Sequence, residues 1–220
     1  MAFDYALARE NMVQKQLRPW YVNNQRILAV FNTLQRERFV PAPLQHIAYA
    51  DIEIPIAAQQ MTLRPAVQAR ILQALDLQPD QSVLVVGTGT GLLTGYCSLL
   101  AGTVVSVEIH AELSTEARHA LHSHGLIDRC QLILADVFNW RHDMRFDAIC
   151  LCGAVSELPD DMLKWLHPQG RILVIHGNGP TKNVALLHRQ GDARAPTMTS
   201  LFETNIPYLI GGEPASRFQF

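Results

Sequence analysis

Three glycines stand together in the run Val85-Val86-Gly87-Thr88-Gly89-Thr90-Gly91, where a β-branched stretch gives way to a helix-like one. Because glycine has no Cβ, it lets the backbone turn sharply and approach a ligand closely. The next β-branched run ends at Glu108, and a carboxylate there can accept hydrogen bonds from two ribose hydroxyls. Read alone, the glycines fit a tight turn and Glu108 a solvated strand end. Together they predict a nucleoside-binding loop.

The spacing of the glycines separates three nucleotide ligands. A dinucleotide fold needs Gly-x-Gly-x-x-Gly, but the place of its third glycine is taken by Leu92. A P-loop needs a lysine directly after the glycines, and the chain's three lysines lie elsewhere. Gly-x-Gly-x-Gly with a downstream Glu resembles the nucleoside loop of Rossmann-like methyltransferases that use S-adenosylmethionine. Asp136 lies where that class places an acidic residue against the adenine amino group; alone, it equally fits an N-cap of a turn through Asn139.

Short apolar runs alternate with helix-length segments after residue 78, which is the βαβ pattern. Strands buried on both faces of a parallel sheet are typically continuous in this way. The last two runs are joined by the loop 190–196 without a helix, so they predict an antiparallel pair at one edge. The expected strands are 82–86, 103–107, 131–134, 146–151, 171–175, 184–189 and 202–209. The predicted fold is α/β, a Rossmann-like class I methyltransferase with a mostly parallel, doubly wound sheet and an antiparallel edge hairpin.

Residues 1–77 predict an N-terminal helical cap that carries a substrate-side segment, and residues 78–220 the S-adenosylmethionine-binding domain. The two parts are expected to form one structural unit. Helices are predicted over 8–17, over 24–34 with Asn23 as N-cap, and from Pro65 to about Leu75. Prolines within 39–41 and 54–56 predict extended loops.

The composition excludes several classes of protein. Hydrophobic residues make up 48% and charged residues 17% of the 220 residues, which is typical of a globular protein. A net charge of −2 argues against a nucleic-acid partner. No apolar run approaches the roughly 20 residues that span a bilayer, and no leader pattern opens the chain, so we expect a cytoplasmic protein without a membrane partner.

The cysteines and histidines do not predict a metal site. Cys97, Cys130, Cys150 and Cys152 lie in apolar stretches without Cys-x-x-Cys spacing, which indicates buried free thiols. His119, His122 and His124 stand near Cys130, but His124 adjoins the glycine where the helix should end. They are therefore predicted to face solvent.

Short blocks along nearly the whole chain resemble the protein-L-isoaspartate O-methyltransferases, in that family's order. The blocks are 12–13, 16–17, 38–41, 48–51, 54–56, 60–65, Trp140, 146–149 and 166–171. The resemblance implies that the protein uses S-adenosylmethionine to methylate the carboxylate of isoaspartyl residues in damaged proteins, which begins their repair. Its partners would be proteins or peptides that carry isoaspartyl residues.

The resemblance also implies a set of site residues. The cofactor would be held by Val86, Gly87, Thr88, Gly89, Gly91, Glu108, Ile109, Asp136 and Val137. The acceptor would lie against Ile56, Ala57, Gln60 and Arg64. The catalytic position is Leu63, with Thr62 one residue before it.

Three positions depart from the family's pattern. The family's Gly-Gln-Thr-Ile-Ser-x-Pro segment aligns with Gln59-Gln60-Met61-Thr62-Leu63-Arg64-Pro65, so Leu63 replaces the expected serine, and an alkyl chain cannot donate a hydrogen bond. Val85 replaces an acidic residue and Val137 a glycine. Thr62 either supplies the missing hydroxyl or is an ordinary loop threonine.

These departures leave two alternatives to isoaspartyl methylation. One is a methyltransferase retargeted to another acceptor, because Arg64 could receive an anion bidentately, although an arginine in a first helical turn is more often solvated. The other is a degenerate cofactor-binding module. The sequence leaves open the oligomeric state and the role of Phe218 and Phe220.

Overall fold

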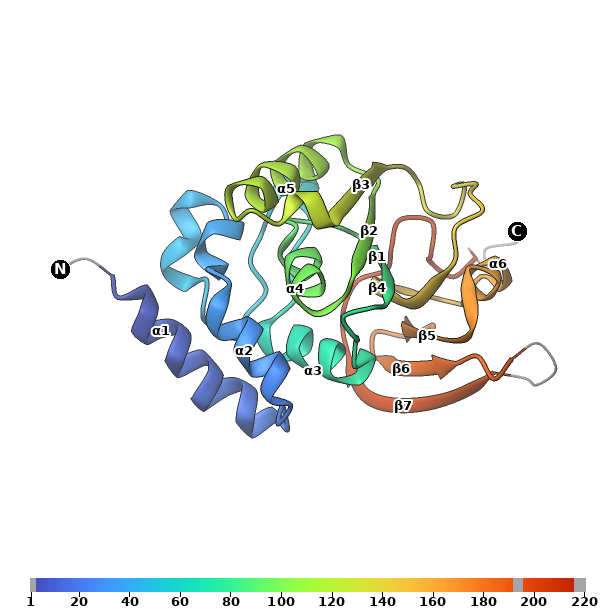
Figure 1. Ribbon diagram of the computed structural model, residues 1–220, viewed down its shortest axis with the longest axis horizontal. Helices are drawn as coiled ribbons and strands as arrows, with labels where there is room; N and C mark the ends of the chain where they lie inside the picture. The colour runs from blue at the N-terminus through green and yellow to red at the C-terminus, as the bar shows by residue number, and fades with distance from the viewer. Residues whose placement is uncertain (1–2, 192–195, 216–220) are drawn as a thin grey trace, which may run out of the picture.

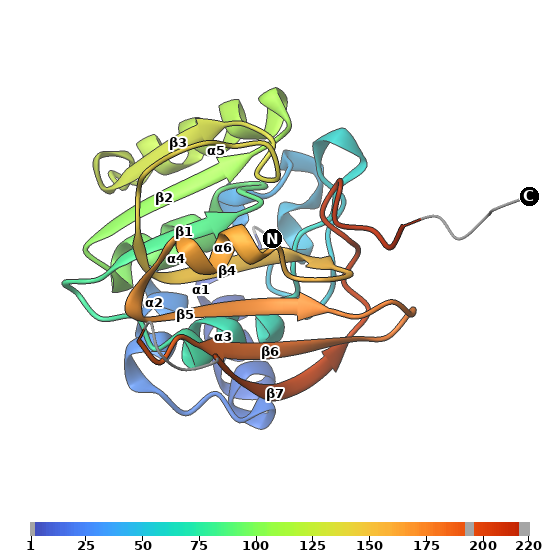
Figure 2. The same cartoon turned by 90° about the vertical axis from the view of Figure 1, so that its right-hand side faces the viewer.

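The computed structural model describes residues 3–191 and 196–215 (Figure 1). Its centre is a seven-stranded sheet in the order β3-β2-β1-β4-β5-β6-β7 (Figure 2). The strands from β3 to β5 pair in parallel, whereas β6 and β7 are antiparallel. Their bounds are β1 Ser82–Val86, β2 Thr103–Glu108, β3 Cys130–Leu134, β4 Phe146–Val155, β5 Leu166–His176, β6 Lys182–His188 and β7 Thr197–Thr204. The predicted fold class is confirmed.

The direction in which strands are added reverses between β1 and β4. The chain runs from β1 outward to β2 and β3, then crosses back so that β4 pairs with the other side of β1. In an open α/β sheet, the crevice at the carboxyl ends of two such strands is where ligands bind. The glycine loop follows β1 and therefore opens onto this crevice.

The long helices cover one face of the sheet. They are α1 Tyr5–Met12, α2 Gln25–Thr33, α3 Pro65–Leu75, α4 Leu92–Leu100 and α5 Ala111–Ser123. In Figure 2 the labelled helices α1 to α4 lie behind the sheet, while the short helix α6, Asp160–Lys164, lies in front. One buried cluster joins the cap to the sheet, and within it the rings of Phe31 and Tyr96 stack with centroids 4.2 Å apart.

The antiparallel edge was predicted correctly in kind but wrongly in place. The last strand is Thr197–Thr204, not 202–209, because residues 206–210 leave the sheet edge and return to the end of β4. There the Ala154 amide donates to the Pro207 carbonyl at 2.8 Å, and the Leu209 amide donates to the Ala154 carbonyl at 2.8 Å. Of the predicted loop 190–196, residues 192–195 lie outside the described part of the chain.

The first two predicted helices differ from the structure at their ends. The helix expected over 8–17 begins at Tyr5, because Asp4 accepts a hydrogen bond from the Leu7 amide at 3.0 Å. It continues beyond Met12 as a π-helix, Val13–Leu17, and a 3₁₀ turn, Arg18–Trp20. The N-cap of α2 is Asn24 rather than Asn23; its side chain accepts from the Arg26 amide at 2.9 Å. The helix predicted from Pro65 is confirmed as α3.

The two proline-containing segments are more ordered than the predicted extended loops. Two 3₁₀ helices, Arg36–Phe39 and Ala42–Ile47, flank the extended Val40. The second segment folds back on itself as a tight loop: the Ile56 amide donates to the Gln60 carbonyl at 2.9 Å, and the Thr62 amide donates to the Ile54 carbonyl at 2.9 Å. Thr62 and Leu63 follow this loop directly.

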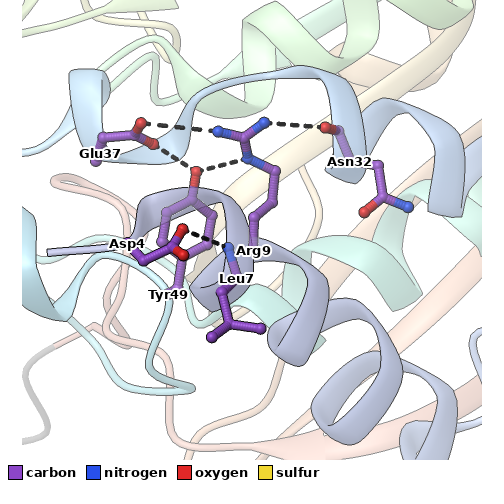
Figure 3. A network of polar contacts seen from close by, with 6 residues as sticks. All are labelled: Asp4, Leu7, Arg9, Asn32, Glu37 and Tyr49. Atoms are coloured by element: carbon purple, nitrogen blue, oxygen red, sulfur yellow. Dashed lines mark hydrogen bonds and ion pairs between the residues drawn. The ribbon is translucent and has the colours of Figure 1, made fainter.

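A polar network holds the cap together (Figure 3). Arg9 of α1 donates to the Tyr49 hydroxyl at 2.9 Å and to the Asn32 carbonyl at 3.2 Å, and it lies 3.8 Å from a Glu37 oxygen. Tyr49 in turn donates to Glu37. Burial and the hydrogen bond with Glu37 raise the pKa of Tyr49, so its hydroxyl keeps the proton that it donates.

None of the helices in the described residues has both the length and the apolar character that a membrane-spanning helix needs.

Candidate functional site

A cavity opens at the carboxyl ends of β1, β2 and β4. Its floor is the glycine loop and the end of β2, and one wall is the loop that runs from Glu53 to Leu63. The opposite walls are residues 135–137, after β3, and residues 206–210. The sheet thus places segments that are far apart in sequence around one space.

The glycine loop has the backbone conformation that the sequence predicts. Gly87, Gly89 and Gly91 have φ values of +90°, +54° and +84°, a region that favours glycine. The Gly87 amide donates to the Val107 carbonyl at 2.9 Å, so the loop starts in register with β2. Gly87, Thr88 and Gly89 line the cavity, together with Val86 before them.

Glu108 is the polar centre of the floor. It is 5% exposed, and its carboxylate accepts hydrogen bonds from the amides of Gly89, Ile109 and His110, at 2.9 Å, 3.0 Å and 3.0 Å. These bonds fix the carboxylate and tie the glycine loop to the end of β2. Two carboxylate oxygens offer about four lone-pair positions, so Glu108 can still accept a hydrogen bond from a ligand hydroxyl.

Asp136 lies across the cavity in a turn that it holds itself. Its side chain accepts from the Phe138 amide at 3.0 Å and from the Asn139 side-chain amide at 2.6 Å. The turn through Asn139 that the sequence offered as an alternative is therefore present. Asp136 also lines the cavity, as do Ile109 and Val137, so the local turn and a ligand contact are compatible.

The acceptor-side wall contains both residues of the altered motif. Thr62 and Leu63 line the cavity with Ile56 and Gln60. The Thr62 hydroxyl accepts from the Ile54 amide at 3.0 Å, which leaves its proton available for a ligand. The Gln60 side-chain amide donates to the Ala58 carbonyl at 3.2 Å.

Three predicted site residues lie outside the cavity lining. Gly91 packs against α5, where an added Cβ would lie 3.0 Å from the Ala117 Cβ. Arg64 points its guanidinium over the ring of Trp20, 5.3 Å from the centroid. Ala57 belongs to the short 3₁₀ turn behind Ile56.

The sequence reasoning missed several lining residues. They are Glu53, Met61, Gln68, Thr90, Leu92, Leu93, Val107, His110, Leu113, Ala135, Cys152, Gly153 and residues 206–210. One signal was available: Gln68 is a single polar residue within the apolar run Ala66-Val67-Gln68-Ala69. Nothing local marks 206–210, because its place depends on the pairing with β4.

The charges of the cavity identify the kind of ligand that fits. Its acidic lining residues are Glu53, Glu108 and Asp136, and no lysine or arginine among the described residues lines it. A polyphosphate would meet only like charge there. A cationic, hydroxylated ligand fits, and the ring Nε2 of His110 is a buried atom without a hydrogen-bond partner among the described residues, which such a ligand could satisfy.

The four cysteines are free thiols. Cys97 and Cys150 are buried, and Cys130 and Cys152 are half-buried. A hydrogen bond with Cys150, together with burial, raises the pKa of the Cys152 thiol beside the cavity, so this thiol stays protonated. No group of metal-ligating side chains occurs in the described ranges. His119 and His122 are exposed as predicted. The prediction is wrong for His124, which is half-buried, bonds the Ala120 carbonyl at 2.8 Å and has a buried Nε2 atom.

Substitutions at two glycines of the loop are expected to have different effects, one on folding stability and the other on ligand binding. We expect Gly91→Ala to lower the free energy of unfolding by about 2 kcal/mol or more, since the new methyl meets the backbone of Ala117 at 3.2 Å. Gly89→Ala should cost about 1 kcal/mol, because the nearest atom is Ile56 Cδ1 at 3.8 Å; its methyl would instead enter the ligand space. Urea denaturation and binding of S-adenosylhomocysteine measure the two effects. Equal stability of both variants would contradict this assignment.

Comparison with known proteins gives a consistent result. Residues 7–206 match the model of a family described as protein-L-isoaspartate(D-aspartate) O-methyltransferase. The protein-L-isoaspartate O-methyltransferase 2 of Shewanella sediminis is 33% identical over 189 residues, covering 86% of this chain and 78% of the relative. The protein-L-isoaspartate O-methyltransferase of Koribacter versatilis is 32% identical over 210 residues, 95% of this chain and 93% of the relative.

Solved structures share the fold. A Plasmodium falciparum protein described as a beta-aspartate methyltransferase, solved with S-adenosyl-L-homocysteine, superposes with a TM-score of 0.79 at 18% identity, covering 94% of this chain and 98% of that one. A structure described as a protein-L-isoaspartate O-methyltransferase gives a TM-score of 0.78 at 20% identity. It covers 91% of this chain, which spans 65% of that longer protein.

Proposed function

Because this chain belongs to the protein-L-isoaspartate(D-aspartate) O-methyltransferase family, we propose that it methylates the side-chain carboxylate of isoaspartyl residues in proteins, with S-adenosylmethionine as cofactor. The observation that carries the proposal is the cavity at the switch point of the sheet. It joins the glycine loop and Glu108 to the motif segment at Thr62 and Leu63. One space thus contains a nucleoside-binding end and an acceptor end.

The lining residues fit the cofactor. Glu108 keeps lone pairs for the ribose hydroxyls while three backbone amides hold it in place. The backbone of Gly87, Thr88 and Gly89 would contact the methionine part, and Asp136 with Val137 would flank the adenine, since all of these residues line the cavity. We assign Val86 and Ile109 to the same cofactor contact and Gly91 to the packing that holds the loop in shape.

S-adenosylmethionine supplies a methyl group on a positively charged sulfonium. An aspartyl-type carboxylate is ionised at neutral pH, so the protein needs no general base to prepare it. Alignment is the main requirement, since the acceptor oxygen must approach the methyl carbon in line with its bond to sulfur. The chain's contribution is therefore to bind, orient and enclose the two reactants.

Residues 1–77 provide the acceptor side in this proposal, and residues 78–220 hold the cofactor. Ile56 and Gln60 line the cavity beside Thr62 and Leu63, where they would contact the acceptor peptide. The Thr62 hydroxyl has a free proton to donate to the acceptor. Ala57 and Arg64 do not line the cavity, so we assign them to contacts with the peptide outside it.

The decisive experiment is transfer of labelled methyl from S-adenosylmethionine to an isoaspartyl peptide, with the matching aspartyl peptide as control. Cofactor binding is recorded on the same sample. The proposal expects selective transfer to the isoaspartyl peptide. Micromolar cofactor binding without transfer would overturn the acceptor assignment and favour a retargeted enzyme, and absence of both would favour a degenerate module.

The substitution at Leu63 can be reversed. We expect Leu63→Ser to raise kcat/KM for the isoaspartyl peptide about tenfold, because a hydrogen bond to a charged group contributes about 1.5–3 kcal/mol and a part of this is lost with the half-buried alkyl chain. Leu63→Ala is the matched control, since it removes the alkyl chain without adding a hydroxyl. Equal rates for the serine and alanine variants would show that the hydroxyl is not what the site lacks.

The free state of all four cysteines supports a cytoplasmic location, because reducing compartments keep thiols unpaired. The partners we propose are protein or peptide substrates that carry isoaspartyl residues.

A further inference from the structure

Gln68 of α3 is a buried polar residue in the acceptor-side wall. It is 4% exposed, it lines the cavity beside Thr62 and Leu63, and its neighbours in α3 are apolar. A buried amide in such a place needs hydrogen-bond partners, and its partners determine which end faces the ligand.

Arg36 fixes the orientation of this amide. The Arg36 side chain is fully buried, and it donates to the Ala48 carbonyl at 2.6 Å, to the Leu63 carbonyl at 3.1 Å and to the side-chain oxygen of Gln68. A guanidinium can donate but never accept. The oxygen of Gln68 must therefore face Arg36, and the NH₂ group must point the other way.

The NH₂ group of Gln68 is free to bind a ligand. Within the described part of the chain, Nε2 donates to no acceptor, and this atom remains accessible to solvent. Because Gln68 lines the cavity, the open side of its amide is the cavity itself. Two N–H donors thus lie next to Leu63, which occupies the position of the serine hydroxyl expected in the family's pattern.

The charge behind the amide strengthens these donors. Arg36 forms no ion pair with a carboxylate among the described residues, and Asp51 offsets its positive charge only in part, from a longer distance. Donation into the Gln68 oxygen polarises the amide, and hydrogen bonds in such chains reinforce one another. The NH₂ end is therefore suited to an anionic oxygen.

We propose that Gln68 is a positioning residue that holds the acceptor carboxylate through its side-chain NH₂ group, with Arg36 fixing and polarising the amide. This inference rests on the proposed isoaspartyl activity. One carboxylate oxygen would accept from Gln68, and the other would form the new bond to the methyl carbon while the carbon–sulfur bond breaks and its electron pair stays on sulfur, which leaves neutral S-adenosylhomocysteine. A neutral amide suits this step because the carboxylate loses its charge as the ester forms, so a direct cation would stabilise the reactant more than the transition state.

Gln68→Glu separates this role from a structural one. The new carboxylate still accepts from Arg36, so the melting temperature should stay the same or rise, while the donors are replaced by a negative charge facing the acceptor. We expect the KM for the isoaspartyl peptide to rise about ten- to a hundredfold. The Kd of S-adenosylhomocysteine should change less than threefold.

Gln73→Glu is the matched control. It makes the same change of charge on the same helix, but Gln73 accepts from the amides of Asn23 and Asn24 and does not line the cavity. Its KM should equal that of the unmodified protein. Gln68→Met is the second variant: it removes the donors without adding charge, so KM should rise as well, with a lower melting temperature.

The outcomes are distinct. If the unmodified protein methylates the isoaspartyl peptide and a folded Gln68→Glu or Gln68→Met variant has the same KM, the role of Gln68 is overturned. The proposed function then stays intact. An unmodified protein that binds cofactor but neither binds nor methylates the isoaspartyl peptide overturns the proposed function, and the role of Gln68 with it.

Discussion

Glu108→Gln is expected to weaken the binding of S-adenosylhomocysteine at least a hundredfold. The carboxylate is the one polar group of the cavity floor that three backbone amides hold in place, and it has lone pairs left for ribose hydroxyls. An amide replaces one acceptor oxygen by a donor. The loss of two hydrogen bonds to a charged group, at about 1.5–3 kcal/mol each, corresponds to a hundredfold or more.

Isothermal titration calorimetry measures this effect, with thermal unfolding recorded on the same samples. Glu112→Gln is the control, because Glu112 is exposed in the first turn of α5 and does not line the cavity. A folded Glu108→Gln that binds within threefold of the unmodified protein would show that the ribose is held elsewhere.

Arg36→Met should lower the free energy of unfolding by about 3–5 kcal/mol. Two buried acceptors, the Ala48 carbonyl and the Gln68 oxygen, and the part-buried Leu63 carbonyl lose their donor, and each unsatisfied buried group costs about 1–3 kcal/mol. Part of this cost is offset, because a methionine no longer carries a buried charge. Burial lowers the pKa of the Arg36 guanidinium, because a charged group is less well solvated inside the protein than in water.

Chemical denaturation checks this value, and Arg38→Met is the matched control. Arg38 lies in the same 3₁₀ helix but is exposed, so its loss should change the stability by less than about 0.5 kcal/mol. If the two variants were equally stable, the buried hydrogen bonds of Arg36 would not contribute to folding. Arg36→Met should also raise the acceptor KM, since Gln68 then loses its fixed orientation.

The central sheet could be predicted from the sequence because its signal is local. Strands buried on both faces show as continuous apolar runs, so the predicted 82–86 coincides with β1 and the predicted 103–107 falls one residue short of β2. The glycine loop and Glu108 were found for the same reason: their chemistry follows from their place at the ends of those strands. The bounds of the edge strand were predicted wrongly because all residues of β7 are exposed or half-buried. Its sequence therefore lacks the continuous apolar run that marks the buried strands.

The rest of the site depends on contacts that spacing does not encode. Arg36 and Gln68 are 32 positions apart, and the sequence shows neither that the arginine is buried nor that the amide faces a cavity. Arg64 was proposed as a new anion contact, whereas the structure places its guanidinium over Trp20. In the proposal above, the buried Arg36 influences the acceptor side through its hydrogen bond to the Gln68 side chain.

The return of residues 206–210 to the end of β4 has a consequence for the order in which the chain supplies the site. The glycine loop and Glu108 precede this segment in the sequence, and the wall that pairs with Ala154 follows the last strand of the sheet, β7. A chain synthesised only as far as β7 has all seven strands of the sheet but lacks this wall of the cavity. The nucleoside-binding end of the site is therefore present before the pocket is closed.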